Sequence, residues 1–380
     1  MFSQKLLYLV IAPLIFFIHT SCHKEPISKN EEIFLRGIQA TWNERMKKEG
    51  SHEPAASPDE AWFTSGDVIS MKNAGANCLE IHQIGLPELM PERNVPNLEF
   101  FENWVDIWVD WCTQNDMYCI LDITGFGAQA DWAIYLSMPS WLWEDMNSLP
   151  TTKAEYDWFI RSFFDLDNTE QVSNRLAFFK LWKFIANRYK NNPYVIYSIM
   201  NEPFCHVEIP NSATATHLGY SYSKFMEQIV DTIRSTGSEQ KIIIDIPFLW
   251  NSYWQPTVQS VDRDNIVWES HVYLAPWGSP TLNDWKEKVF QDIQKIVIEF
   301  QKPLFIGEFG IAPISEIRTT YATNWQSILS GQAAYLDSLQ LFGRQYHCWD
   351  DMYGEYAIFS SGSDLTSEES DWIIETVLSN

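Results

Sequence analysis

Residues 182–203, WKFIANRYKNNPYVIYSIMNEP, indicate a helix, a turn and then a buried strand. Apolar side chains recur near a 3.6-residue period over 176–189, as on one face of an amphipathic helix. The Asn-Asn-Pro of 191–193 would end that helix, because proline restricts the residue before it to extended backbone. The nearly continuous apolar run 194–200 is typical of a strand buried on both faces. It leads directly to a carboxylate, Glu202.

The same unit recurs in residues 285–310, WKEKVFQDIQKIVIEFQKPLFIGEFG. An apolar stripe at helical spacing comes first and consists of Trp285, Val289, Ile293, Ile296 and Phe300. Pro303 stops the predicted helix, and the short apolar run 304–308 follows it. This second run also ends in a carboxylate, Glu308.

Eight short apolar runs of this kind are spread over the chain and predict strands at 34–39, 77–82, 118–123, 194–200, 241–246, 266–273, 304–308 and 345–349. Strands that alternate with helices favour right-handed crossovers and a parallel sheet. Eight repeats favour closure into a single-domain (β/α)8 barrel over residues 34–380. A doubly wound open sheet is the competing architecture, although no GxGxxG follows the first predicted strand.

The charge is strongly one-sided, with 26 Lys and Arg against 50 Asp and Glu, a net −24. An acidic surface repels phosphate backbones, so nucleic acid is not an expected partner. Aromatic residues make up 15% of the chain and include 18 tryptophans. Such a surplus fits either a tryptophan-rich core or stacking against the apolar faces of sugar rings. We expect a monomer that acts on a neutral ligand.

The first residues predict a targeting segment. Lys5 precedes the apolar run 6–18, which is too short to span a bilayer comfortably. Thr20-Ser21-Cys22 follows and resembles a bacterial lipoprotein signal, although His19 stands where an aliphatic residue is usual. We therefore expect a signal peptide at 1–22, a polar tether at 23–33, lipidation of Cys22 and a place in the bacterial cell envelope. Ordinary signal cleavage, with secretion, and a simple anchor are the alternatives.

The other cysteines form no metal motif. They are odd in number, no CxxC occurs, and none has zinc spacing to a histidine: Cys78, Cys112, Cys119, Cys205 and Cys348. We expect buried thiols, and neither a metal nor a cofactor.

Glu202 and Glu308 would lie at the active end of such a barrel. Chemistry in this fold belongs to the carboxyl ends of the strands. The two glutamates end the fourth and the seventh of eight strands, so they would face each other across the opening. Cleavage of a glycosidic bond needs two carboxyl groups, one to protonate the leaving oxygen and one to meet the anomeric carbon. The simpler alternative is that each glutamate caps a following turn.

With these motifs in place, the chain resembles glycoside hydrolase family 5, the cellulase-like group of retaining (β/α)8 enzymes. The matching stretches are LRGIQ at 35–39, GANCLEI at 75–81, ILD at 120–122, YSIMNEPF at 197–204, ESHVY at 269–273, FIGEFG at 305–310 and the tryptophan of HCWDD at 347–351.

The resemblance implies separate roles for the two carboxylates. Glu202 would be the acid/base and Glu308 the nucleophile of a double displacement. It also implies roles for four further residues at strand ends. Asn201 would hydrogen-bond the sugar 2-hydroxyl, His271 and Tyr273 would orient the two carboxylates, and Trp349 would form the floor beneath the sugar. Taken singly, His271 would be a core histidine and Trp349 a barrel-plug aromatic.

Two positions depart from the family. Glu80 stands where the family usually has an arginine that holds the nucleophile's charge, and Thr124 stands where it usually has a histidine. A second carboxylate near Glu308 would weaken it as a nucleophile. Either Glu80 points elsewhere or Arg36 supplies the missing cation. His82 is a further candidate for sugar contact.

Several tryptophans fall in predicted loops at the active end of the barrel. Barrel loops seldom need so many for packing, so we expect sugar-stacking platforms among Trp132, Trp143, Trp250 and Trp277. The sequence thus predicts a hydrolase of β-glucan or β-mannan type. A non-catalytic glycan-binding lipoprotein and a transglycosylase remain the alternatives.

Overall fold

A computed structural model of the chain describes residues 34–40, 55–61, 63–81, 95–123, 152–204, 207–247, 258–274, 281–311, 324–349, 358 and 366–378. Internal contacts divide the chain into two units, 1–33 and 34–380. The predicted signal peptide, the tether and Cys22 lie outside the described residues. Within the described ranges, no helix combines the length and the apolar character that a membrane span requires.

Eight parallel strands close into one barrel, in which each strand pairs with the next along the chain and the last pairs with the first. They are β1 (Leu35–Ile38), β2 (Cys78–Ile81), β3 (Tyr118–Asp122), β4 (Val195–Ser198), β5 (Ile242–Asp245), β6 (Ile266–Leu274), β7 (Leu304–Ile311) and β8 (Gly343–Tyr346). The predicted (β/α)8 barrel is confirmed. An open sheet is excluded, because it would leave two strand edges unpaired.

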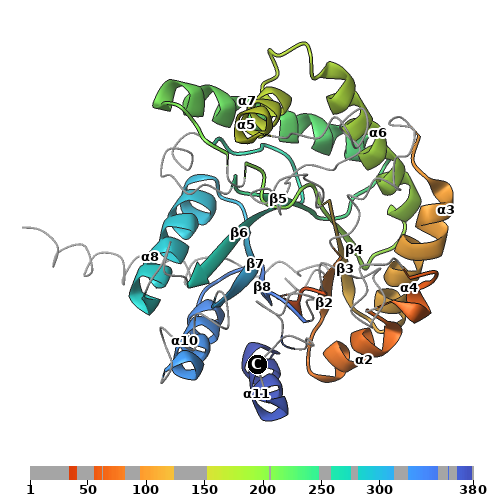
Figure 1. Cartoon of the computed structure of the whole chain (residues 1–380), viewed down its shortest axis with the longest axis vertical. Coiled ribbons are helices and arrows are strands. Elements are labelled where there is room, and N and C mark those ends of the chain that lie inside the picture. Colours follow the sequence, from red (N-terminus) through yellow and green to blue (C-terminus); the bar gives the residue numbers. More distant parts are fainter. Residues whose placement is uncertain are drawn as a thin grey trace, which may run out of the picture. The chain divides into compact units, whose positions relative to one another are not determined.

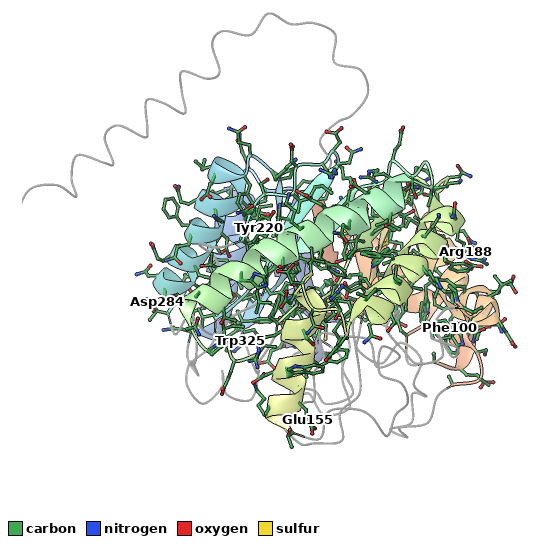
Figure 2. The ribbon with its side chains drawn as sticks, turned by 90° about the horizontal axis from the view of Figure 1, so that it is seen from above. Phe100, Glu155, Arg188, Tyr220, Asp284 and Trp325 are labelled. Carbon is green, nitrogen blue, oxygen red and sulfur yellow. The ribbon has the colours of Figure 1, made fainter. Side chains whose placement is uncertain are left out.

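Helices surround the strands, as Figure 1 shows. They are α2 (Ser65–Asn73), α3 (Leu98–Phe100), α4 (Asp106–Gln114), α5 (Lys153–Phe164), α6 (Val172–Tyr189), α7 (Ser212–Arg234), α8 (Leu282–Ile293), α10 (Trp325–Asp337) and α11 (Ser367–Leu378), with the short 3-10 helix η1 (Pro58–Glu60) and the π-helical segments η3 (Phe101–Val105) and η6 (Gln294–Glu299). Between β5 and β6, the described residues end at 247, resume at 258 and contain no helix. Figure 2 shows α7, with Tyr220, beside α6, with Arg188 near its end.

The helix-to-strand unit around residue 190 has the predicted form. Trp182 and Ile185 are buried, whereas Leu176 is 51% exposed and lies outside the packed stripe. The side chain of Asn192 accepts a hydrogen bond from the backbone N–H of Tyr194 at 3.0 Å, which closes the turn into β4.

The eighth strand begins two residues before its predicted start and ends three before its predicted end. Gly343 and Arg344 do not resemble buried strand residues. However, a Cβ at Gly343 would lie 2.3 Å from the carbonyl oxygen of Leu35, so only glycine fits this pairing. Arg344 is fully buried. Its burial is tolerated because its guanidinium donates hydrogen bonds to Asp337 and to the carbonyl of Val377.

The interior of the barrel is layered. Strands β1 to β7 each contribute one side chain to an apolar floor, made of Leu35, Cys78, Ile120, Ile196, Ile243, Val267 and Phe305. Two residues further along, the inward positions of six strands form a buried layer that we call the polar layer, made of Glu80, Asp122, Ser198, Asp245, Glu269 and Gln345. On β1 and β7 the equivalent positions are glycines, Gly37 and Gly307. The site lies immediately above this layer.

The four described cysteines, Cys78, Cys112, Cys119 and Cys348, are free and buried, as predicted, and Cys205 lies outside the described residues.

Candidate active site

An unusual backbone conformation delivers Glu202 to the end of the barrel. Its φ is 42°, in the left-handed region that residues with a side chain rarely adopt. The carboxylate of Asp245, in the polar layer, accepts a hydrogen bond from the backbone N–H of Glu202 at 2.7 Å. That bond holds the chain in a turn which regular strand geometry would not produce.

A β-bulge delivers Glu308. Ser270 pairs with Ile306 and His271 pairs with Glu308, so Gly307 is an extra residue on β7. The bulge turns Glu308 into the barrel, where strict alternation would have pointed it outward. A Cβ at Gly307 would lie 1.4 Å from Oε1 of Glu269, so the absent side chain leaves room for that carboxyl group.

Glu202 and Glu308 converge around one histidine. One oxygen of each carboxylate and one ring nitrogen of His271 all lie within 4.8 Å of one another. The Glu202 side chain is 17% exposed, whereas that of Glu308 is 3% exposed. The first carboxylate can therefore exchange protons with solvent, while the second is enclosed.

His271 lies among four carboxyl groups. Its Nδ1 lies 2.9 Å from Oε1 of Glu202 and 3.4 Å from Oε2 of Glu308. Its Nε2 lies 3.5 Å from Glu269 and 3.9 Å from Asp245. Burial by itself would lower the pKa of His271. Glu308, Asp245 and the hydrogen bonds to Glu202 and Glu269 raise it by more than burial lowers it, so the pKa lies well above its ordinary value. The surrounding carboxyl groups therefore favour the protonated, cationic form of the ring.

Each oxygen of Glu308 accepts a hydrogen bond. The Tyr273 hydroxyl donates to Oε2, and Nε2 of Gln39 donates to Oε1 at 2.9 Å. Nδ1 of His347 in turn donates to Oε1 of Gln39. We did not predict Gln39 or His347, although both are polar residues at strand ends within the quoted motifs LRGIQ and HCWDD.

The polar layer beneath the site contains four carboxyl groups and no Lys, Arg or His side chain. Burial raises the pKa of Glu80 well above its usual range, and Glu269, Asp122 and Glu308 add to the shift. Burial likewise raises the pKa of Asp245 and of Glu269, although His271 opposes both shifts. These three carboxyl groups therefore retain protons at pH values where exposed carboxyl groups have lost them.

The chain matches the family model Cellulase (glycosyl hydrolase family 5) over residues 55–350. The chain belongs to glycosyl hydrolase family 5. It is 28% identical to the cellulase CelDZ1 of Thermoanaerobacterium sp. over 163 residues, which are 42% of this chain and 39% of that relative. This family 5 chain therefore spans well under half the length of the curated relative that it matches.

Solved structures of the same fold include endo-glycoceramidase II from Rhodococcus sp. in its lactosyl-enzyme form. The TM-score is 0.66 at 15% identity, over 93% of this chain and 80% of that one. A triple mutant of the endo-beta-1,4-glucanase of Xanthomonas axonopodis pv. citri gives 0.56 at 15% identity, over 91% of this chain and 99% of that one. At such identities these likenesses show the fold alone.

The sequence left two explanations for the missing family 5 arginine: either Glu80 points away from the site, or Arg36 supplies the cation. Glu80 does point into the barrel, where it is 1% exposed. Arg36 does not supply the cation, because its guanidinium lies 3.5 Å from Asp337 of α10. Leu35 and Gly37, on either side of it, face the interior, so alternation directs Arg36 outward. Our interpretation of Arg36 was therefore wrong.

Trp349 lies three residues beyond the end of β8 and is 5% exposed, and its indole Nε1 donates to Asp67 of α2 at 3.3 Å. Asn201 is 6% exposed and lies three residues beyond the end of β4, immediately before Glu202. Their contacts with sugar stay predictions. The remaining predicted site residues, His82, Thr124, Trp132, Trp143, Trp250 and Trp277, lie outside the described residues.

Two groups of described residues bring three potential metal-ligand atoms together. One is Glu202, His271 and Glu308, where the raised pKa of His271 opposes metal ligation, since a metal needs the neutral imidazole. The other is Asp165, Asp167 and His217 at the surface, where Nε2 of His217 lies 2.8 Å from Asp165.

Proposed function

We propose that this chain is a retaining glycoside hydrolase that cuts a β-linked glycan of β-glucan or β-mannan type. The approach of Glu202 and Glu308 carries the proposal, since one oxygen of each lies within 4.8 Å of the other. Retaining enzymes hold their carboxyl groups roughly 5–5.5 Å apart, whereas inverting enzymes leave roughly 6.5–9.5 Å for a water molecule. Membership of family 5 supports the same reaction class.

In the first step, an oxygen of Glu308 attacks the anomeric carbon and forms a glycosyl ester. Glu202 gives its proton to the departing oxygen, so the bond to the leaving sugar breaks without releasing an alkoxide. Tyr273 and Gln39 each donate to an oxygen of Glu308, which fixes the direction from which the carboxylate attacks.

In the second step, Glu202 takes a proton from a water molecule, and the oxygen of that water attacks the anomeric carbon. The ester bond breaks and Glu308 leaves as a carboxylate again. The positive charge of His271 lies within 3.4 Å of Oε2 of Glu308 and stabilises the charge that returns there.

The test measures hydrolysis of barley β-glucan, carboxymethylcellulose, glucomannan, galactomannan and xylan by the wild type and by Glu202→Gln and Glu308→Gln. Proton NMR of the first product formed reports its anomeric configuration. We expect a β-configured product from a glucan or a mannan, and a loss of about 10⁴-fold or more in Glu308→Gln. An initial α product, or a Glu308→Gln enzyme as active as the wild type, would contradict the proposal.

A non-catalytic glycan-binding protein is the second candidate, favoured by the carboxyl group of Glu80 where a cation is usual. It would bind one of these glycans, as measured by calorimetry, and release no reducing ends. A transglycosylase would instead lengthen oligosaccharides, which mass spectrometry of the products detects.

We also propose export and lipidation of Cys22, on the strength of the apolar run and the Thr-Ser-Cys that follows it. Cys22→Ser should prevent incorporation of radiolabelled palmitate and move the protein out of the membrane fraction. Equal labelling of the variant would contradict this assignment.

A further inference from the structure

Gln39 and His347 approach Glu308 from the ends of β1 and β8, whereas His271 and Tyr273 approach it from β6. Gln39 follows β1 and is fully buried, and His347 follows β8 and is 4% exposed. His347 has no part in the steps described above, and Gln39 enters them only as a donor to Glu308. Both are nevertheless directed at the nucleophile, since Nδ1 of His347 lies 4.0 Å from Oε1 of Glu308.

The hydrogen bonds between these side chains can run in one direction only. The amide oxygen of Gln39 has no hydrogen, so Nδ1 of His347 must be the donor in their contact. That bond directs the amide nitrogen of Gln39 towards Glu308, 2.9 Å away. The carboxylate can only accept, so a chain of donors runs from His347 through Gln39 to Glu308.

Backbone bonds fix both members of the pair. The N–H of Gln39 donates to the carbonyl of Tyr346 at 3.0 Å, and the N–H of Trp349 donates to the carbonyl of Gln39 at 2.9 Å. The N–H of His347 donates to the carbonyl of Phe309, one residue after the nucleophile, at 3.3 Å. The donors and the carboxylate thus belong to one hydrogen-bonded framework of β1, β7 and β8.

Glu80 explains why Glu308 needs such a donor in this chain. Glu80 lies one layer below Glu308. When the side-chain amide of Gln345 is oriented so that both its nitrogen and its oxygen have partners, its nitrogen donates to Oε2 of Glu80 at 2.8 Å. The oxygen of that amide accepts from the N–H of Gln39 at 3.1 Å and from the N–H of Glu80 at 3.2 Å. A carboxyl group held in this way offers no cation to the nucleophile.

We propose that Gln39 and His347 are positioning residues for the nucleophile, and that their donor chain to Oε1 of Glu308 takes the place of the arginine that Glu80 has replaced. The amide of Gln39 holds the carboxylate in its attacking orientation and stabilises its charged form. His347 acts through Gln39 by preventing the amide from rotating. This inference rests on the proposed function.

The charged and titratable groups around Glu308 come from several strands. His271 and Tyr273 face it from β6, and His347 faces it from the end of β8. Glu202 approaches from the end of β4, while the nearby carboxyl groups of Glu80 and Glu269 belong to the polar layer. None of these groups changes in a variant of Gln39, so a change in pH dependence there reports the lost donor.

The test compares pH profiles of kcat/KM for dinitrophenyl β-cellobioside in the wild type and in Gln39→Met, which keeps the chain length and removes the donor. The acid limb of that profile reports ionisation of the free enzyme's nucleophile. We expect the limb to move up by about one pH unit, and kcat/KM at pH 6 to fall about 10- to 100-fold.

The matched control is Gln332→Met. Gln332 of α10 is also fully buried and also donates to β7, to the carbonyl of Gly310 at 3.1 Å, but from the outer side of the barrel. Its loss should lower the thermal midpoint and leave the acid limb in place. If Gln39→Met behaves like this control, its role is structural and the inference is overturned.

A double variant tests the chain of donors. His347→Phe removes Nδ1 and keeps a ring against Tyr273, whose centroid lies 6.0 Å away. We expect a smaller shift of the acid limb in the same direction, and no additional shift when His347→Phe is combined with Gln39→Met. Additive shifts would overturn the chain, because His347 would then act independently. A wild type that hydrolyses no aryl glycoside or glycan refutes the proposed function itself, whereas an active wild type with unshifted variants refutes only this inference.

Discussion

Glu202 and Glu308 carry identical side chains in different surroundings, and the surroundings assign their roles. Glu308 is enclosed and accepts hydrogen bonds on both oxygens, from Tyr273 and Gln39, which favours its charged form. Glu202 is more exposed, and its Oε1 lies 2.9 Å from Nδ1 of His271. A group that must gain and lose a proton in each cycle needs this access to solvent. A group that must attack as an anion needs the fixed donors.

Replacement of Glu202 separates the two chemical steps. Glu202→Ala should lower turnover of an unactivated glycan by about 10²–10⁴-fold, because the leaving oxygen then departs without a proton. With dinitrophenyl β-cellobioside, whose leaving group needs no proton, kcat/KM should stay within about 10-fold of the wild type. Steady-state kinetics on the two substrates measures this. Equal losses on both would assign Glu202 a role other than acid catalysis.

The resemblance pointed to four polar residues that the structure brings together, namely Glu202, Glu308, His271 and Tyr273. Gln39 and His347 were missed, because a buried glutamine or histidine at a strand end usually satisfies a turn or the core. Only their contacts in the folded chain, Gln39 with Glu308 and His347 with Gln39, distinguish them. Arg36 was assigned incorrectly, because one position along a strand reverses the direction of a side chain.

At the level of elements, β7 and β8 depart most from regular strand geometry. The bulge at Gly307 directs the nucleophile inward, and β8 contains a glycine and a fully buried arginine. Neither feature follows from apolar periodicity, which is why the predicted eighth strand was displaced. Short parallel strands still follow from the apolar runs, because each is buried on both faces.

Gly307→Ala should disrupt the bulge. The new methyl group would meet Oε1 of Glu269 at 1.4 Å, so either β7 or the carboxyl group must move. We expect a loss of about 1–3 kcal/mol in the free energy of unfolding, with a larger proportional loss of activity than of stability. Denaturant unfolding and kcat/KM measure the two. The control Gly66→Ala places its methyl group 3.4 Å from Thr64 and should be neutral or slightly stabilising.

Arg344 joins β8 to the last two helices, since its guanidinium donates to Asp337 at 2.8 and 3.0 Å and to the carbonyl of Val377 in α11. Arg344→Met should lower the free energy of unfolding by about 2–4 kcal/mol, because buried acceptors lose their donor. The exposed pair of Arg263 and Asp231 provides the control, and Arg263→Met should cost less than about 1 kcal/mol. Equal effects in urea unfolding would contradict a role for Arg344 in holding α11.

Across the whole barrel, the polar layer makes stability depend on pH. Burial raises the pKa of Glu80 in the folded protein, so above the ordinary glutamate value of 4.5 the folded state binds more protons than the unfolded one. The raised pKa of His271 acts in the same direction above its ordinary value of 6.5. The free energy of unfolding should therefore fall as pH rises from mildly acidic to alkaline values.

Glu80→Gln should reduce that dependence. A neutral amide needs no proton to remain buried, so the thermal midpoint should rise by about 2 °C or more at pH 8 and change less at pH 5. Calorimetry at the two pH values measures the difference. The control is Glu299→Gln, at a residue that is 61% exposed in its pair with Lys295, which should show no such trend. A variant destabilised equally at both pH values would contradict a protonated Glu80.

Closure of the barrel was predictable from eight repeats of strand and helix. The layering inside it was not, because inward and outward positions alternate within runs that are apolar on both faces. The polar layer breaks those runs at single residues such as Glu80 and Asp245, and a sequence pattern does not show that six of them meet at one level.

The central claim is that Glu308 forms a glycosyl ester during turnover. The direct measurement is mass spectrometry of the protein after incubation with a dinitrophenyl β-cellobioside in which fluorine replaces the 2-hydroxyl, followed by peptide mapping. We predict one fluorinated disaccharide per chain, attached to the peptide that contains Glu308, and no labelling of Glu308→Gln. Attachment at Glu202 or at any other residue, or an active wild type that acquires no label, would contradict the account.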